Sequence, residues 1–487
     1  MTTTKRPRKP AGGDIDRLED GVPYYHSYSG SGSARQPPPD RRPPPAASGL
    51  SAELYARVAR RYCHPAFNLG TTFVSGVRGP VFERVVHATP FWRLTTFDRV
   101  PPTPDADVPS VLVLPPYAGH CPTLVRDTVA AFLPGHAVHV AGWADARDVP
   151  LAAGAFGLGE AIEAVADMVT EIGGAVHVVA VMEAGVIGIA AAALLGRRGQ
   201  PPATLTLIGG PVDCRADHAG LATGAATRGL DWFMRAVIAP VPPPFEGVYR
   251  EVFPGFFTLT GLLTRGFDRS IADPKELFVG LVAGDGDSAG GHREFFDEFL
   301  AVMDVPAEFM LQWIEAVLID RPFAAEPGQT ILSQATPPLA GTPLMTVEAE
   351  IDAFGGGGQT HAAHMMTGAP SAGCRHTEDR AGRFALFNGA RWRASVFPRV
   401  ADFIANHAGP PKPSRPAPTE DLLTLSGLTP AFVARLNREG LYFMHQLARL
   451  DEAAAGHLDR RLGTETHPLA AQLGREARRR LAEAGRS

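Results

Sequence analysis

The alternation of apolar and polar residues predicts a strand, a sharp turn and a helix at 176–195. A valine-rich, mainly apolar run at 176–181 predicts a buried strand, and small residues separate it from an Ala-, Ile- and Leu-rich helix. Other short apolar runs predict more strands, and an amphipathic pattern predicts a helix at 158–170. Such alternation indicates a mainly parallel sheet covered by helices on both faces. The other strands are predicted at 111–114, 137–140, 205–208 and 344–347.

Changes in composition divide the chain into four parts. Residues 1–48 are rich in Pro, Gly, Ser and Arg, and they lack the aliphatic residues that would offset ordering, so we expect a disordered tail. The α/β domain is predicted at 49–407, and the proline-rich stretch 408–418 is typical of a stiff linker. Short helical patterns at 419–487 predict a small all-α module.

Two stretches of the α/β domain depart from the alternating pattern. Residues 50–86 have a mainly helical pattern with a break near Gly79. Residues 231–323 are helical in pattern, rich in Phe and Leu, and without a clear strand, which predicts a lid over the carboxyl edge of the sheet. We expect Phe256 and Phe257 to form an exposed apolar patch on this lid.

Composition and charge exclude several classes of protein. Hydrophobic residues make up 45% of the chain and charged residues 20%, which is typical of a soluble globular protein. The net charge of -5 gives no general basic field for nucleic acid. Four widely spaced cysteines without CxxC pairs argue against zinc and disulfides. Without a secretory signal or a long apolar run, we expect a cytoplasmic protein with no membrane span.

Several sequence blocks occur in order between about residues 50 and 407. They are Ala118-Gly119-His120 and the stretches 143–147, 206–213, 254–256, 292–304, 358–364 and 387–393. These blocks resemble the intracellular polyhydroxybutyrate depolymerases, cytoplasmic α/β-hydrolases that attack amorphous storage polyester. The resemblance implies an α/β-hydrolase fold, no metal or other cofactor, and polyester granules or granule proteins as partners. Neither tail is covered by it.

The resemblance also implies which residues occupy the catalytic positions. The family's nucleophile is a cysteine followed by Gln-Pro, and Met182 and Glu183 stand at the first two of these positions. The catalytic acid is retained as Asp352. The family's histidine corresponds to Arg383. The substrate and oxyanion loop corresponds to Gly119, His120 and Glu183.

The residues at two of these positions cannot perform the family's chemistry. A thioether at position 182 has no proton to lose and does not attack esters. Arg383 stays protonated and cannot accept a proton as a general base. We therefore expect a catalytically impaired protein that binds or regulates polyester granules, with Arg383 in an ion pair with Asp352 or Glu183.

The alternative is an active depolymerase with a relocated nucleophile. Cys121 lies in the oxyanion loop, although a lone cysteine there more often serves packing, and Glu183 offers a carboxylate. His361 and His364 have metal-ligand spacing but no completing carboxylate, so we expect helix-surface or structural residues. The glycines at 355–358 lack the Lys-Ser/Thr of a phosphate loop and indicate flexibility.

The C-terminal module resembles a helix-hairpin-helix unit at 423–437. Such units contact DNA phosphates through backbone N–H groups at a Gly-x-Gly turn and a helix N-terminus. Thr429 replaces the second glycine, and acidic residues nearly balance the arginines of the module. Weak contact with protein is therefore supported as well as contact with DNA, and a granule–DNA adaptor is a third hypothesis.

Overall fold

The computed structural model describes most of the predicted α/β domain and of the C-terminal module. The predicted tail 1–48, the linker from residue 409 onward and Phe256 lie outside the described residues. The described residues are 66–74, 76–99, 108–214, 225, 227–255, 257–258, 298, 301–319, 339, 341–352, 357–369, 374–408, 422–439, 441, 443–464 and 469–484.

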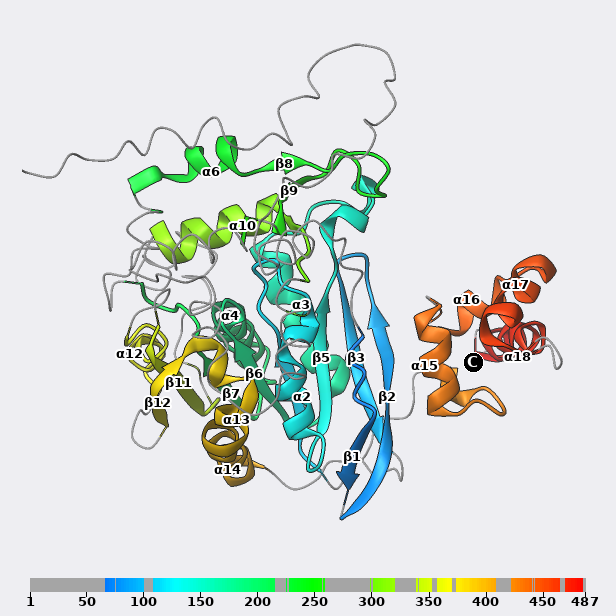
Figure 1. Cartoon of the computed structure of the whole chain (residues 1–487), viewed down its shortest axis with the longest axis horizontal. Helices are drawn as coiled ribbons and strands as arrows, with labels where there is room; N and C mark the ends of the chain where they lie inside the picture. The colour runs from blue at the N-terminus through cyan, green and yellow to red at the C-terminus, as the bar shows by residue number, and fades with distance from the viewer. Residues whose placement is uncertain are drawn as a thin grey trace, which may run out of the picture. The chain divides into compact units, whose positions relative to one another are not determined.

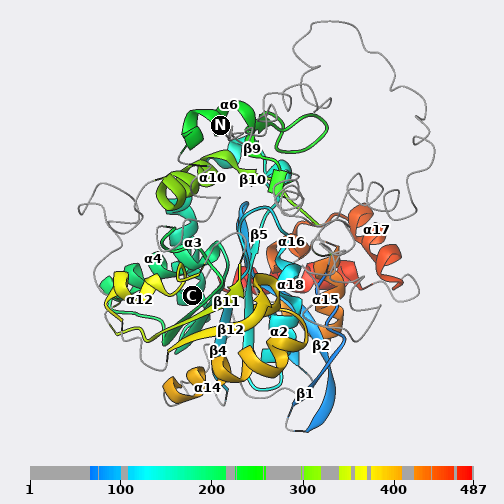
Figure 2. The same cartoon turned by 60° about the vertical axis from the view of Figure 1, so that its left-hand side comes forward.

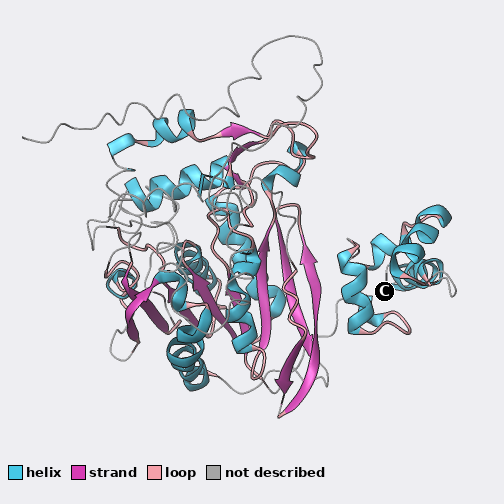
Figure 3. Cartoon of the chain, viewed as in Figure 1, coloured by secondary structure: helices cyan, strands magenta, loops and turns pink. Residues whose placement is uncertain are grey.

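A mixed sheet forms the centre of the described structure (Figure 3). Its strands are β1 (Thr71–Val74), β2 (Val77–Ala88), β3 (Trp92–Arg99), β4 (Ser110–Leu114), β5 (Ala137–Trp143), β6 (Val176–Val181), β7 (Thr204–Ile208), β11 (Leu344–Ile351) and β12 (Arg375–Gly382). They lie in the order β1-β2-β3-β5-β4-β6-β7-β11-β12. The pairings from β1 to β5 are antiparallel, and those from β5 to β12 are parallel. The prediction of a mainly parallel sheet is confirmed.

Helices cover both faces of this sheet (Figures 1 and 2). Leu112 and Leu114 of β4 pack with the helices on one face, whereas Val111 and Val113 pack with those on the other. Successive side chains of a strand point to opposite faces, so one apolar strand contributes to two cores. The first face carries α3 (Leu158–Ile172), α4 (Ala184–Arg197) and α12 (Ala362–Thr367), and the second carries α2 (Arg126–Phe132) and α14 (Phe397–His407).

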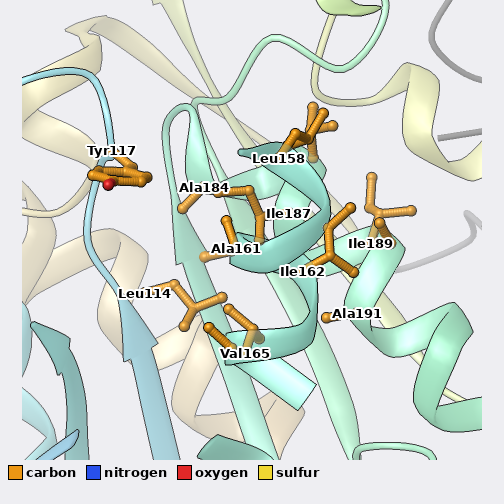
Figure 4. Packing of buried hydrophobic residues seen from close by; sticks show 14 of the residues in the cluster. Leu114, Tyr117, Leu158, Ala161, Ile162, Val165, Ala184, Ile187, Ile189 and Ala191 are labelled. Carbon is orange, nitrogen blue, oxygen red and sulfur yellow. The ribbon is translucent and has the colours of Figure 1, made fainter. Parts of the chain in front are cut away.

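The connection between β6 and α4 has the predicted form. The strand covers Val176–Val181 as predicted, and Met182 follows at a φ of 54°, in the left-handed region that non-glycine residues seldom adopt. Figure 4 shows Ala184 and Ile187 at the start of α4 beside Ala161 of α3. A strand, a strained left-handed apex and a helix, set in this mixed sheet, identify the α/β-hydrolase fold.

The prediction of a helical pattern at 50–86 is wrong where the structure describes it. Residues 71–88 form β1 and β2 instead, joined by a turn at Gly76 with a φ of 81°. The first part of β2 pairs with β1, and the rest pairs with β3, from Val81 opposite Arg99 to Ala88 opposite Arg93. The partner strand β3 lies outside the segment 50–86. The spacing of apolar residues within that segment therefore could not show that it pairs as a strand.

The lid also contains strands that the sequence did not predict. They are β8 (Ala239–Pro240), β9 (Glu251–Phe253) and β10 (Val305–Pro306), in the order β10-β9-β8. Strands of two or three residues are too short to show an alternating pattern. The described helices of the lid are α6 (Leu230–Ala236) and α10 (Ala307–Ile314), which continues into a π-helical turn at Glu315–Ile319.

The predicted apolar patch on the lid is described only at Phe257, because Phe256 lies outside the described residues. Phe257 is half-buried, with its ring centroid 6.3 Å from that of Phe253. Instead, Trp232 and Met234 of α6 are 38% and 45% exposed, and Tyr249 is 71% exposed. No helix in the described part of the chain is both long and apolar enough to cross a membrane.

The C-terminal module is built from helices with a core of their own. Thr429 precedes the first long helix and accepts a hydrogen bond from the Phe432 amide on its side chain, as expected of an N-cap. Val433, Leu447 and Leu473 are buried within the module. The helices are α15 (Pro430–Arg438), α16 (Met444–Ala448), α17 (Glu452–Leu462) and α18 (Ala470–Ala484).

Candidate functional site

Two neighbouring parallel strands place Asp352 beside Arg383. Ile351 at the end of β11 pairs with Gly382 at the end of β12, and the two charged residues directly follow these strand ends. The guanidinium makes a bidentate contact, with Nε 3.1 Å from Oδ1 and Nη2 3.0 Å from Oδ2 of Asp352. Both side chains are only 7% exposed. The predicted ion pair is therefore present, and it is buried.

Glu183 lies on the other side of the same guanidinium. Its Oε1 is 4.0 Å from Nη1 of Arg383, and its side chain is 15% exposed. Burial raises the pKa of Glu183 above its ordinary value, and the Arg383 guanidinium opposes this rise. The Arg383 guanidinium thus lies between the carboxylates of Asp352 and Glu183, and it is closer to Asp352.

The elbow holds Met182 with its side chain turned into the core. Met182 is 3% exposed and packs among apolar residues that include Val181 and Ile208. Its backbone N–H donates to Ile208 O at 2.8 Å, and its carbonyl accepts from the Gly185 N–H at 2.9 Å. The strained backbone of a nucleophile elbow is retained around a thioether.

Gly210 is required by the close approach of the elbow. A Cβ added there would lie 2.2 Å from the carbonyl oxygen of Met182, a backbone atom that cannot move aside. We expect Gly210→Ala to lower the free energy of unfolding by at least about 2 kcal/mol, measured by urea titration. Gly159→Ala in α3 is the matched control, because its Cβ meets nothing within 4 Å. A loss in the control as large as that of Gly210→Ala would contradict the packing argument.

The oxyanion loop is held by backbone pairing with residues 301–303. The Cys121 N–H donates to Ala301 O at 3.0 Å, and Gly119 O accepts from the Met303 N–H at 2.8 Å. Gly119 adopts a φ of 100°, and His120 is 2% exposed. The amide of Cys121 is therefore already bonded and does not face an open oxyanion position.

An acidic pair joins the end of β5 to the base of the lid. Asp304 receives the Arg147 side chain at 2.7 and 3.1 Å and the Gly255 N–H at 3.1 Å. The Asp304 amide donates to Asp145 at 3.0 Å. Burial, with Asp304 adding to it, raises the pKa of Asp145 to about 7, whereas Arg147 opposes the rise. Sequence blocks about 150 residues apart thus meet in one network, which sequence reasoning did not foresee.

His361 and His364 are buried rather than on a helix surface. They are 7% and 4% exposed, and both contact the hydroxyl of Thr346 on β11, at 2.7 and 3.0 Å. The amide of His361 also donates to Glu348 at 2.6 Å. The helix-surface alternative is wrong, and the structural alternative agrees with these contacts.

We expect the buried His361 to make the protein less stable in acid. Burial, with Arg375 adding, lowers the pKa of His361 to about 4, so the unfolded chain takes up its proton first as the pH falls below about 6.5. Between pH 7.5 and pH 5 this group should cost about 2 kcal/mol of stability. Urea titrations should show a shallower pH dependence for His361→Gln than for the exposed control His457→Gln. Equal slopes for the two variants would contradict the assignment.

Among the described residues, no group of three or more His, Cys, Asp and Glu side chains is arranged to hold a metal ion. Cys121, Cys214 and Cys374 are free thiols.

Residues 209–408 match the family described as PHB de-polymerase C-terminus. This stretch of the chain is similar to the C-terminal domain of the PHB depolymerases. It contains Asp352, Arg383 and the buried histidines, whereas Met182 and Glu183 precede it. No match was found among curated proteins.

Solved structures of several enzymes are similar to this chain at low identity and low TM-score. A membrane phospholipase A, described as a bacterial virulence factor, is 13% identical, with 67% of this chain and 87% of that one covered at a TM-score of 0.38. The 2-hydroxy-6-oxo-6-phenylhexa-2,4-dienoate hydrolase of Rhodococcus sp. strain RHA1 is 11% identical. The match covers 68% of this chain and 99% of that one, at a TM-score of 0.38. A thermophilic esterase of Thermogutta terrifontis is 11% identical. The match covers 67% of this chain and 98% of that one, at a TM-score of 0.37. At these scores the similarity carries no statement about function.

Proposed function

We propose that this protein binds polyhydroxyalkanoate granules or their proteins in the cytoplasm and does not hydrolyse polyester efficiently. The observation that carries the proposal is the buried bidentate pair of Arg383 and Asp352, at the position where the family resemblance implies a histidine. A guanidinium cannot accept the nucleophile's proton, and the carboxylate that would orient a histidine is occupied.

The nucleophile position supports the same conclusion. Met182 stands at the left-handed apex, and its thioether is turned into the core at 3% exposure. Attack, proton transfer and acylation therefore lack both a nucleophile and a base.

Cys121 is poorly suited to act as a relocated nucleophile. It is 2% exposed, and burial raises the pKa of its thiol to about 12, with Asp145 adding to the effect. At neutral pH roughly one thiol in 10⁵ would be the reactive thiolate. An active depolymerase that relies on this thiol is the less supported alternative.

Glu183 is poorly suited for a different reason. Its pKa is raised by burial, and Arg383 holds one of its oxygens at 4.0 Å. The other oxygen is buried without a hydrogen-bond partner among the described residues. A carboxylate nucleophile must reach the substrate, and this one is directed to a guanidinium instead.

Two exposed apolar side chains of α6 supply contacts for the granule proposal. We expect Trp232 and Met234 to contact the polyester, because apolar side chains exposed on a lid gain free energy on leaving water. Sedimentation of purified protein with amorphous polyhydroxybutyrate granules should show binding. The variant Trp232→Ser, Met234→Ser should bind at least about 10-fold more weakly.

Two other exposed apolar side chains, on β1 and β2, provide a matched control. Phe73→Ser, Val77→Ser removes side chains that are 57% and 55% exposed on β1 and β2. This control should bind granules like the wild type. Failure of the wild type to bind, or equal losses in both variants, would contradict the granule proposal.

A further inference from the structure

The C-terminal module carries exposed arginines, and only some of them pair with a carboxylate among the described residues. Arg461 pairs with Glu439 at 2.6 Å, and Arg480 pairs with Glu476 at 3.1 Å. Other arginines of the module have no carboxylate partner among the described residues, and their side chains are exposed. One of them, Arg460, belongs to α17, and the other four are Arg449, Arg475, Arg478 and Arg479.

These other four arginines are gathered on one surface. Arg475, Arg478 and Arg479 follow one another at the spacing that places side chains on one face of α18. Gly474 lets α18 approach the end of α16, since a Cβ there would lie 2.9 Å from the Leu447 carbonyl oxygen. Arg478 then donates to the Ala448 carbonyl at 2.6 Å, directly before Arg449. We call these four arginines the α18 basic face.

Helix stabilisation does not account for the α18 basic face. Cations stabilise a helix by interaction with its dipole only within the last turn, and the last turn of α18 contains no basic residue. The ion pair that does support α18, Arg480 with Glu476, lies outside this set. The charge is therefore available to a partner.

The composition of the surface indicates the chemistry of that partner. Protein interfaces and lipid surfaces require apolar or aromatic anchors, whereas nucleic-acid interfaces are polar and strongly cationic. Within the described part of residues 422–484, no large hydrophobic side chain is strongly exposed. The cations are all arginines, whose planar fork makes bidentate contacts with phosphate.

We propose that the α18 basic face binds the phosphodiester backbone of a nucleic-acid duplex, without reading its sequence. Four arginines on a surface without apolar anchors can neutralise phosphates and release counterions. This inference is independent of the granule proposal, because it rests on residues of the C-terminal module alone.

The test is fluorescence anisotropy of labelled duplexes with the full-length protein. A mixed-sequence DNA duplex and an RNA duplex of the same sequence separate the two sources of the backbone. Wild-type affinity should fall with salt at a log–log slope of about -3.6, from roughly -0.9 for each neutralised phosphate. Arg449→Gln, Arg475→Gln, Arg479→Gln should flatten the slope by about 3. Arg478 is retained because it bonds the end of α16.

The matched control removes the same charge elsewhere in the module. Arg435→Gln, Arg461→Gln, Arg480→Gln replaces an arginine stacked over Phe432 and the two carboxylate-paired arginines. This control should retain most of the wild-type slope. No duplex binding at about 50 mM salt would overturn the proposal. Equal losses in both variants, or displacement by polyglutamate as readily as by unlabelled duplex, would do the same.

Discussion

The variant Met182→Cys, Glu183→Gln, Arg383→His is expected to release 3-hydroxybutyrate from amorphous polyester at least about 100-fold faster than the wild type. The three changes restore the side chains that the family resemblance implies at these positions. The left-handed apex at residue 182 is already formed, and Asp352 lies next to position 383, where it can orient a histidine. Glu183→Gln removes the carboxylate that would otherwise lose its cation.

Controls separate restored chemistry from a general loosening of the site. Met182→Ala, Glu183→Gln, Arg383→His keeps the histidine but has no thiol, and it should stay at the wild-type rate. Each of the three changes made alone should also give no increase, because nucleophile and base act as a unit. An equal increase in the alanine control would show that position 182 does not supply the nucleophile.

Arg383→Met is expected to lower the free energy of unfolding by about 3–5 kcal/mol at pH 7.5. The change leaves Asp352 and Glu183 buried without the cation between them, and their mutual repulsion is then uncompensated. Urea titration followed by circular dichroism measures the loss. It should be smaller at low pH, where the stranded carboxylates take up protons.

A second variant and a surface control make this prediction specific. Arg383→Met combined with Asp352→Asn and Glu183→Gln should recover most of the lost stability, because no buried charge remains. Arg198→Met breaks an exposed pair with Glu163, whose side chains are 43% and 52% exposed, and should cost less than about 1 kcal/mol. A similar cost for Arg198→Met and Arg383→Met would mean that the buried pair has no special role.

The centre of the fold was predictable because its strands are continuous apolar runs. The strand at Val176–Val181 has the predicted bounds, and the helix predicted at 158–170 covers Leu158–Ile172. Buried parallel strands show both their type and their length in the sequence, since both faces are apolar.

The outer parts were not predictable in the same way. The hairpin of β1 and β2 is held by pairing with β3, and β8, β9 and β10 are too short to show a period. The residues at 375–382 include six polar or charged side chains, so β12 gave no apolar signal although it holds Arg383 in place.

The sequence predicted which residues occupy the site, but it did not predict most of the contacts that they make. An ion pair of Arg383 with Asp352 or Glu183 was expected, and the parallel register decides that Asp352 makes the closer contact. The pairing of the oxyanion loop with residues 301–303 was not expected, because nothing local in either segment specifies the other. Likewise, the burial of His361 depends on β11, which precedes it in the chain.

The most direct test of the central claim is the turnover of the wild-type protein on amorphous polyhydroxybutyrate granules. Released 3-hydroxybutyrate and granule-bound protein should be counted in the same sample, so that turnover is expressed per bound molecule. The structure predicts bound protein with release no faster than from granules alone, because Met182 and Arg383 supply neither a nucleophile nor a base. Sustained release by the wild type at an enzymatic rate would contradict this account and direct attention to Cys121 and Glu183.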